Sequence, residues 1–361
     1  MEKSGKANNE IRASGAGRRS FLRKAGAAGL AALSAPYVIT RSEAQEDKRI
    51  IVPSYGGSYE ETIQQVYARP FKQETGIEVV FSGVPDLARL KAQVMSGRPE
   101  WDVFEGAGSW GPAGSQQGLF EPLDRSIVTQ AEAVLGKGDY ARFYRWVGVP
   151  AWNTKHANGG DTPKTFAQLW DTKRFPGRRT LRNRADMVLE LALVADGVDP
   201  QKLYPLDVDR AFKALARIKP FVPKWAESTN QLTTLLATNE VDFGFDYNAR
   251  VESARVAGLP LAMSLEQTII GNETIGVVKG TTRKAAAMKF VAFVLRPDRQ
   301  AEFSNKSSYL PGNPAAMSQV SADAKKLLPD LSQHNHIYQD DEYWASRTTE
   351  LQVRFSQFLL S

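Results

Sequence analysis

The chain of 361 residues contains no cysteine and only three histidines. Without cysteine it can form no disulfide, iron–sulfur cluster or cysteine-based zinc finger, and it has no cysteine nucleophile. His334 and His336 lie in a polar stretch that gives a metal site little support. No apolar run reaches the ~18 residues that a membrane-spanning helix needs. We therefore expect a globular protein without a metal centre or cofactor.

Outside the N-terminus the chain also has almost no excess of charge of one sign. The net charge is +6, but residues 1–45 hold eight Lys and Arg against three acidic residues and account for +5 of it. The remaining 316 of the 361 residues are nearly balanced, at +1. A balanced surface provides no bulk attraction for nucleic acid or anionic lipid, so neither is expected as a partner.

The basic N-terminus has the pattern of an export leader. Residues 18–24 read Arg-Arg-Ser-Phe-Leu-Arg-Lys and precede a short apolar stretch, 25–35, that is rich in Gly and Ala. Such a pattern, ending in small residues, describes a signal peptide, assigned to residues 1–45 with cleavage near Ala44. The paired arginines resemble a twin-arginine (Tat) leader, which implies the Tat translocon as a partner and a bacterial periplasmic location.

The exported part alternates strand and helix patterns. The first strand is expected at Arg49–Pro53, and Ser58 with Glu61 has the spacing of a helix-capping box. Two more strands, each preceded by a helix, follow in the next 50 or so residues. The order β-α-β-α-β implies a parallel sheet covered by helices. The pattern predicts two sheets, one before about residue 148 and one after it.

No catalytic or cofactor motif is complete. Residues 106–111 fit G-x-G-x-x-G after a strand, but Asp124 comes too early to be the acidic residue that a dinucleotide site needs about 20 residues later. No G-x-S-x-G elbow is present, so a serine triad has no local support. Most of the seven tryptophans are expected in the core, with Trp225 and Trp344 nearer a pocket or the surface. An enzyme is therefore not expected.

Eight segments, in order along the chain, carry a family resemblance. They are Ser54–Tyr59, Phe71–Val79, Trp101–Phe104, Gly118–Asp124, Phe175–Arg179, Ala195–Val198, Val241–Phe243 and Lys289–Phe293. Together they resemble the periplasmic solute-binding proteins of ABC importers, and within these the spermidine/putrescine-binding (polyamine) group. The resemblance implies a non-enzymatic receptor that captures a small solute in the periplasm and delivers it to a membrane permease.

The same resemblance implies an α/β fold of the periplasmic-binding-protein type, in which two α/β lobes enclose a ligand cleft and crossing strands form the hinge. Lobe 1 would comprise residues 46–148 with 276–312, and lobe 2 residues 149–275 with the tail, 313–361. The lobes would close on the solute by a hinge motion. Ligands of open α/β sheets bind beyond the carboxyl ends of strands, at loops that lead into helices.

Loops at such positions supply the candidate ligand contacts. They are Ser54, Tyr55, Gly56, Gly57, Glu105, Gly106, Tyr247 and Glu273. Tyr55 offers an aromatic wall, and the glycines after it offer backbone N–H groups. The resemblance implies a second aromatic wall at Tyr247 and a carboxylate for a ligand amine at Glu273. A plain β-to-α turn, a core tyrosine and a solvated carboxylate are the structural alternatives.

One segment departs from the polyamine binders. After residues 179–181 that group has paired acidic residues that hold an ammonium group, whereas this chain has Arg182 and Arg184. A guanidinium repels a diammonium ligand and pairs with a carboxylate through a forked pair of hydrogen bonds. If both arginines face the cleft, the solute should be anionic or zwitterionic. If they lie on an exposed edge, they say nothing about the ligand.

Three functions stay open at this point. The first and favoured one is the receptor of an ABC importer, with its ligand divided evenly between a polyamine, by resemblance, and a carboxylate or similar anion, by Arg182 and Arg184. The second is an enzyme with a bound cofactor, because the Tat pathway exports folded proteins. The third is a binding module that senses a solute for a membrane receptor.

Overall fold

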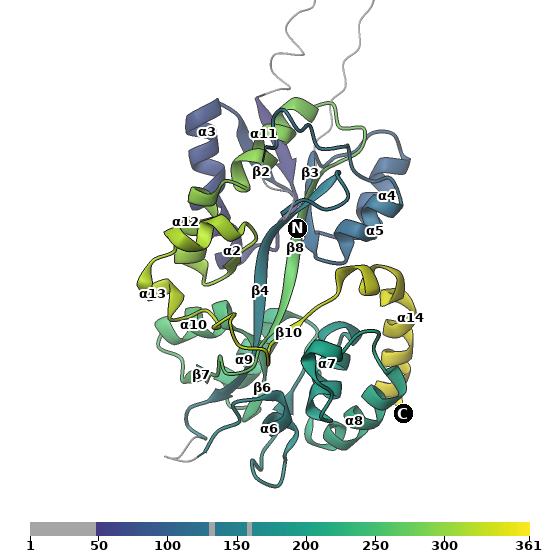
Figure 1. Ribbon diagram of the computed structural model, residues 1–361, viewed down its shortest axis with the longest axis vertical. Helices are drawn as coiled ribbons and strands as arrows, with labels where there is room; N and C mark the ends of the chain where they lie inside the picture. Colours follow the sequence, from purple (N-terminus) through teal and green to yellow (C-terminus); the bar gives the residue numbers. More distant parts are fainter. Residues whose placement is uncertain (1–47, 130–133, 157–160) are drawn as a thin grey trace, which may run out of the picture. The chain divides into compact units, whose positions relative to one another are not determined.

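The computed structural model describes residues 48–129, 134–156 and 161–361 (Figure 1). The predicted signal peptide, with its twin arginines and its cleavage site near Ala44, lies outside the described residues. The described residues belong to one compact unit, 41–361. None of the helices in these three stretches is long and apolar enough to cross a membrane.

The described strands form a small sheet and a large one. They are β1 (Arg49–Val52), β2 (Glu78–Phe81), β3 (Val103–Ala107), β4 (Tyr140–Asn153), β5 (Arg179–Thr180), β6 (Phe243–Tyr247), β7 (Leu261–Met263), β8 (Ile269–Val277), β9 (Leu310–Pro311) and β10 (Ile337–Tyr338). β1 and β2 pair in parallel. The large sheet has the central order β10-β8-β4-β6-β5, while β3 pairs with β8, and β7 and β9 pair with β4.

Helices pack on these strands. They are α2 (Gly57–Ile63), α3 (Arg69–Thr75), α4 (Leu87–Met95), α5 (Trp110–Gln116), α6 (Phe166–Trp170), α7 (Ala185–Ala195), α8 (Val208–Ile218), α9 (Thr229–Ala237), α10 (Asn248–Val256), α11 (Lys284–Val294), α12 (Pro297–Ser307), α13 (Ala322–Lys325) and α14 (Asp341–Leu360). α8 buries one apolar stripe, through Ala211, Leu215 and Ile218. Burial of such a stripe stabilises a helix against a core.

One long strand pair runs through both main hydrophobic cores. β4 pairs antiparallel with β8 over residues 140–148 (Figure 1). Tyr144 of β4 and Ile275 of β8 pack in a core with β1, α2, α3 and α11. Trp146 of β4 and Ile269 of β8 pack in a second core with α6 to α9 and α14. The change from one core to the other therefore falls within β4, between two residues that are neighbours on the same face.

The start of α2 differs from the prediction. Ser58 was expected to cap this helix, but the helix begins at Gly57 and its N-cap is Gly56, without a side-chain hydrogen bond. Gly56 and Gly57 have φ values of 70° and 59°, a conformation that glycine adopts at no steric cost. The two glycines turn the chain into the helix two residues earlier than the capping-box pattern predicts.

The sheet arrangement also differs from the prediction of one sheet before about residue 148 and a second after it. β3, from the first part of the chain, and β6, from the second, belong to the same large sheet. The reason is that β4 continues across the predicted boundary and pairs with β6 and β8, and that β8, from the second part of the chain, also pairs with β3. The predicted parallel pairing is correct for β1 with β2, whereas β3 runs antiparallel to β8.

The C-terminal helix α14 was not predicted; it packs in the core that contains α7 and also contacts α5. Asp340 caps it by accepting a hydrogen bond from the backbone N–H of Tyr343. Trp344 and Phe355 are buried in the core that contains α7. Near its start α14 contacts α5, and Glu342 forms an ion pair with Lys137 at 3.3 Å. The helix thus connects α5 and α7, which lie far apart in the sequence.

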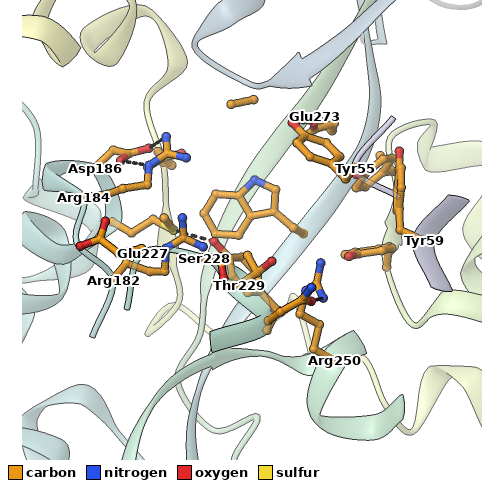
Figure 2. Close-up of a pocket in the computed structure, with 18 residues that line it drawn as sticks. Tyr55, Tyr59, Arg182, Arg184, Asp186, Glu227, Ser228, Thr229, Arg250 and Glu273 are labelled. Atoms are coloured by element: carbon orange, nitrogen blue, oxygen red, sulfur yellow. Dashed lines mark hydrogen bonds and ion pairs between the residues drawn. The ribbon is translucent and has the colours of Figure 1, made fainter. Parts of the chain in front are cut away.

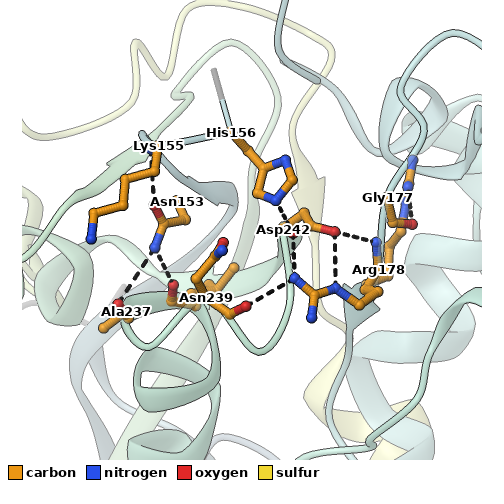
Figure 3. A network of polar contacts seen from close by, with 10 residues as sticks. Asn153, Lys155, His156, Gly177, Arg178, Ala237, Asn239 and Asp242 are labelled. Carbon is orange, nitrogen blue, oxygen red and sulfur yellow. Dashed lines mark hydrogen bonds and ion pairs between the residues drawn. The ribbon is translucent and has the colours of Figure 1, made fainter. Parts of the chain in front are cut away.

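A polar network joins the ends of β4, β5 and β6 (Figure 3). The carboxylate of Asp242 accepts hydrogen bonds from the backbone N–H of Arg178 at 2.6 Å and from its guanidinium at 2.8 Å, and it pairs with His156. Only 3% of the Asp242 side chain is exposed. Burial alone would raise the pKa of Asp242, but the hydrogen bonds from Arg178 and the charge of His156 hold it below its ordinary value. The network therefore depends on an ionised carboxylate.

Asp242→Asn is expected to lower the free energy of unfolding by about 1–3 kcal/mol at pH 7, because an amide cannot accept the charge-assisted hydrogen bonds of Arg178. Urea unfolding followed by circular dichroism measures this loss. Since the pKa of Asp242 is lowered on folding, the advantage of the wild type is present at neutral pH and disappears as the pH falls below 3.8.

Asp323→Asn is the matched control for this experiment. Its carboxylate pairs with Lys326, but 92% of the side chain is exposed. The control should change the free energy of unfolding by less than about 0.5 kcal/mol. Equal losses in the two variants would contradict the role given to Asp242.

Candidate ligand-binding site

A cavity of about 340 Å³ lies beside the centre of β4 and β8, lined by residues from both cores (Figure 2). A volume of this size suits a small organic molecule. The lining residues are Tyr55, Tyr59, Ala107, Tyr144, Trp146, Arg182, Arg184, Asp186, Met187, Glu227, Ser228, Thr229, Asn230, Tyr247, Arg250, Glu273, Tyr309 and Gln339.

The strand pair β4–β8 supplies the floor of the cavity. Tyr144 lies opposite Glu273, and Trp146 lies opposite Gly271. Because opposite residues of an antiparallel pair point to the same face, all these side chains face the cavity. Residue 271 must be glycine, since an added Cβ would overlap the indole of Trp146. The bare backbone at this position lets the indole lie across β8.

Aromatic rings line most of the remaining surface. Tyr55 and Tyr59, from the loop and helix after β1, meet edge to face with centroids 5.6 Å apart. Trp146 and Tyr247 also meet edge to face, with ring centroids 5.6 Å apart. The ring centroids of Tyr144 and Tyr309 lie 4.8 Å apart. Such rings can enclose an aliphatic chain and can also attract a cation through their faces.

One side of the cavity carries a carboxyl group. Glu273 Oε1 accepts a hydrogen bond from the Tyr55 hydroxyl at 2.7 Å, and Glu273 is only 5% exposed. Burial raises the pKa of Glu273 to about 8, although the hydrogen bond from Tyr55 and the charge of Arg184 oppose the rise. The group is therefore mostly neutral at pH 7 in the ligand-free site, and a cation placed beside it would favour its ionised form.

A second carboxyl group lies behind the aromatic wall. Glu105, predicted as a ligand contact, is buried and accepts a hydrogen bond from the Tyr59 hydroxyl at 2.9 Å. Its other oxygen, Oε1, has no hydrogen-bond partner among the described residues. Burial and the nearby charge of Glu273 raise the pKa of Glu105 well above its ordinary value. Glu105 thus supports Tyr59 and does not line the cavity.

Arginines occupy the opposite side, and Figure 2 shows Arg182 and Arg184 across the cavity from Tyr55 and Glu273. Arg184 pairs with Asp186 through two hydrogen bonds, of 2.8 and 2.6 Å. Arg182 is 7% exposed, and its Nε is buried without a hydrogen-bond partner in the described part of the chain. An anion in the cavity would provide the missing acceptor.

A third arginine comes from α10. Arg250 donates a hydrogen bond to Asn230, and within the described residues neither Arg250 nor Arg182 forms an ion pair. Burial raises the pKa of Asp246, a buried residue of β6, to about 7, and the positive charges of Arg250 and Arg182 oppose this rise. Both guanidinium groups therefore lie within electrostatic range of Asp246.

The start of α9 adds neutral hydrogen-bonding groups near these arginines. Ser228 caps the helix by accepting a hydrogen bond from the backbone N–H of Gln231. Thr229 and Asn230 follow in the first turn and also line the cavity. Unpaired N–H groups of a first helical turn favour an anionic partner.

The structure brings half of the predicted site residues to the cavity. Tyr55, Arg182, Arg184, Tyr247 and Glu273 line it. Both arginines thus face the cavity and not an exposed edge. The assignment of these five residues to ligand binding stays a prediction.

The other predicted contacts lie next to the cavity without lining it. Ser54 is buried and accepts a hydrogen bond from the backbone N–H of Gly56. Gly56 and Gly57 form the turn into α2. Gly106, like Glu105, lies within β3, where an added Cβ would overlap the ring of Trp110. These residues shape the turns and strand that hold Tyr55 and Tyr59 in place.

Several lining residues were missed by the sequence analysis. Tyr59 lies in the first turn of α2, and neither it nor Tyr309 belongs to a loop at a predicted strand end. The one sequence signal for Tyr59 is its position four residues after Tyr55. Trp146 lines the cavity, whereas Trp344, expected near a pocket or the surface, is buried in the core. No group of three or more His, Asp or Glu side chains that could hold a metal ion is found among the described residues.

Comparisons with known proteins place the chain in a family. A family model described as bacterial extracellular solute-binding protein matches residues 66–329. The gamma-aminobutyric acid-binding protein of Pseudomonas aeruginosa is 32% identical over 334 residues, covering 86% of this chain and 91% of that protein. The spermidine/putrescine-binding periplasmic protein of Salmonella typhimurium is 24% identical over 282 residues, covering 75% and 78%.

A solved structure gives the same result for the fold. An ABC transporter substrate-binding protein from Bradyrhizobium japonicum has a TM-score of 0.81 and 33% identity, and the match covers 86% of this chain and 99% of that one. The predicted α/β fold of the periplasmic-binding-protein type is confirmed, as is the prediction of a periplasmic binding protein. The alternative of a Tat-exported enzyme is not supported. The chain belongs to the bacterial extracellular solute-binding protein family, whose members serve ABC transporters as substrate-binding components.

Proposed function

We propose that this chain is the periplasmic receptor for a small zwitterion that carries an amine and a carboxylate at the two ends of a short aliphatic chain, with γ-aminobutyric acid (GABA) as the model ligand. The observation that supports it is the arrangement of the cavity, in which the guanidinium groups of Arg182 and Arg184 face the carboxyl group of Glu273 and the Tyr55 side chain (Figure 2). A relative named for GABA binding, 32% identical, points to the same class of ligand.

The carboxylate of the ligand is assigned to the side of Arg182. This guanidinium is buried, lacks an ion pair within the described residues, and has a donor without an acceptor. Arg250 adds a second positive charge, and Ser228 and Thr229 add hydroxyl groups and the first turn of α9. A carboxylate there would complete charge-assisted hydrogen bonds that the ligand-free site leaves unmade.

The amine of the ligand is assigned to Glu273. Its carboxyl group is surrounded by the rings of Tyr55 and Tyr144, which exclude water and present π-faces to a cation. The aliphatic chain between the two charges would lie along Trp146. A polyamine, the other ligand class, would place a second ammonium group against the arginines, which is unfavourable.

The predicted lobes belong to this proposal. The change of hydrophobic core within β4, between Tyr144 and Trp146, supports a hinge near the predicted boundary at residue 148. The floor of the cavity lies at this change, so a ligand there would contact both lobes. Closure around it would create the form that is presented to the permease.

Arg182→Gln is expected to weaken GABA binding by about 10- to 100-fold, because a charge-assisted hydrogen bond worth about 1.5–3 kcal/mol is lost. Isothermal titration calorimetry measures the Kd. Arg89→Gln is the matched control, since this arginine pairs with Glu100 on the surface and should leave the Kd unchanged. Wild-type protein that binds putrescine but not GABA would refute the zwitterion assignment, and so would Arg182→Gln with wild-type GABA affinity.

The affinity for an amine ligand should depend on pH through Glu273. Its pKa is about 8 without ligand, so below pH 8 binding of an ammonium group must release a proton. Affinity for GABA should therefore rise by up to about tenfold per pH unit toward pH 8 and become constant above it. Titrations in buffers of different ionisation enthalpy measure the release, which should approach one proton at pH 7.

Glu273→Gln tests this assignment, because an amide does not titrate. The variant should bind GABA more weakly at pH 8 and should show a flat pH profile. A profile with the wild-type slope in Glu273→Gln would assign the proton release to another group, and the amine would then have a different partner.

Export by the Tat translocon is the remaining part of the proposal, and it is supported only by the leader sequence with Arg18 and Arg19. Arg18→Lys combined with Arg19→Lys keeps the charge but removes the twin-arginine pair. We expect this double variant to accumulate in the cytoplasm as unprocessed precursor, as measured by cell fractionation and immunoblotting. Arg12→Lys is the control, and undiminished export of the double variant would contradict the Tat assignment.

A further inference from the structure

The ion pair between Arg184 and Asp186 lies in the cavity beside the guanidinium of Arg182, whose Nε has no hydrogen-bond partner among the described residues. Asp186 Oδ1 accepts from Arg184 Nε at 2.8 Å, and Oδ2 accepts from Nη2 at 2.6 Å. The two side chains are only 35% and 12% exposed. This forked geometry occupies one of the two edges through which the guanidinium can hold a carboxylate.

An unusual backbone keeps Asp186 in this position. The pair is two residues apart at the start of α7, where a regular helix would point the side chains to different faces. Instead Asp186 is extended, with ψ of 142°, and Met187 has φ of 71° and ψ of −53°. A positive φ at a bulky residue is strained and persists only where the surroundings hold it.

The surroundings of Met187 provide that restraint. The side chain is 2% exposed and lies in the core with α7, and its sulfur accepts a hydrogen bond from the Tyr247 hydroxyl at 3.3 Å. Tyr247 itself lines the cavity. The strained turn, and with it the direction of the Asp186 carboxylate, is therefore fixed by the same residues that form the cavity wall.

Arg184 also acts on the part of the cavity assigned to the ligand amine. Its positive charge opposes the rise in the pKa of both Glu273 and Tyr55, which burial causes. In the proposed pose, a carboxylate on the carbon that bears the amine would extend from Glu273 across the cavity toward Arg184, which lines the opposite side. In the wild-type protein it would find Asp186 there, already paired and negatively charged.

We propose that Asp186 is a specificity-determining residue that excludes ligands with a carboxylate beside the amine. The inference rests on the proposed function, in which Arg182 binds the distant carboxylate and Glu273 binds the amine. An ω-amino acid such as GABA needs no contact with Arg184 and is accepted. L-Glutamate, which differs from GABA by one carboxylate on the amine-bearing carbon, must compete with Asp186 for Arg184 and is rejected.

Removal of the Asp186 charge tests the proposal through the ratio of two dissociation constants, that for L-glutamate over that for GABA. In Asp186→Asn, Arg184 is free to pair with the second carboxylate, so the ratio should fall by about tenfold or more. In the double variant Arg184→Gln with Asp186→Asn, both charges are gone, and the ratio should return to within about threefold of the wild-type value. Calorimetric titration at pH 8 with both amino acids measures it.

Asp196→Asn is the matched control, because Asp196 lies at the other end of α7, outside the cavity, and pairs with Arg210 and Arg217. This variant should leave the ratio unchanged. Asp186→Ser removes the same charge and replaces Asp186→Asn if that variant melts too low to titrate. Melting temperatures of all variants separate loss of folding from loss of discrimination.

The outcomes distinguish this inference from the proposed function. Folded wild-type protein that does not bind GABA refutes the proposed function, and the inference falls with it. GABA binding together with an unchanged ratio in Asp186→Asn overturns the inference alone. An equally low ratio in Asp186→Asn and in the double variant also overturns it, because the gain would then not involve Arg184.

Discussion

The antiparallel pairing of β4 with β8 is the constraint on which the rest of the structure depends. These strands carry side chains into both main cores, and their shared face is the floor of the cavity. Tyr144 and Trp146 are two residues apart on that face, yet each packs in a different core. A solute bound on this floor, as proposed, would contact residues of both cores, which is the arrangement that closure on a ligand requires.

The ligand-free cavity holds polar groups whose hydrogen-bonding capacity is unused. Arg182 Nε is buried without a hydrogen-bond partner among the described residues, and burial keeps Glu273 largely protonated at pH 7. Buried polar groups in this condition destabilise the unliganded state, and a ligand with matching charges removes that cost. Selectivity follows from the same effect, because a ligand that lacks one of the two charges leaves one side of the cavity unsatisfied.

Local sequence patterns predicted the first strand and the helix after it, but neither the cap of that helix nor the pairing of distant segments. The resemblance to solute-binding proteins supplied the fold, and the two arginines after β5 indicated a ligand with a carboxylate. The outcome for tryptophan shows the limit of such patterns. The sequence around Trp146 and the acidic sequence before Trp344 do not indicate where either ring lies. The register of β4 against β8 places Trp146 in the cavity, and the packing of α14 buries Trp344.

The indole of Trp146 has a practical consequence. Of the seven tryptophans, all within the described residues, it alone lines the cavity, where it lies across Gly271 and meets Tyr247 edge to face. Its emission depends on the polarity around the ring, which changes when a solute replaces water. Intrinsic fluorescence excited at the red edge of tryptophan absorption should therefore report occupancy without a dye, and Trp146→Phe should abolish the signal while the other six rings continue to emit.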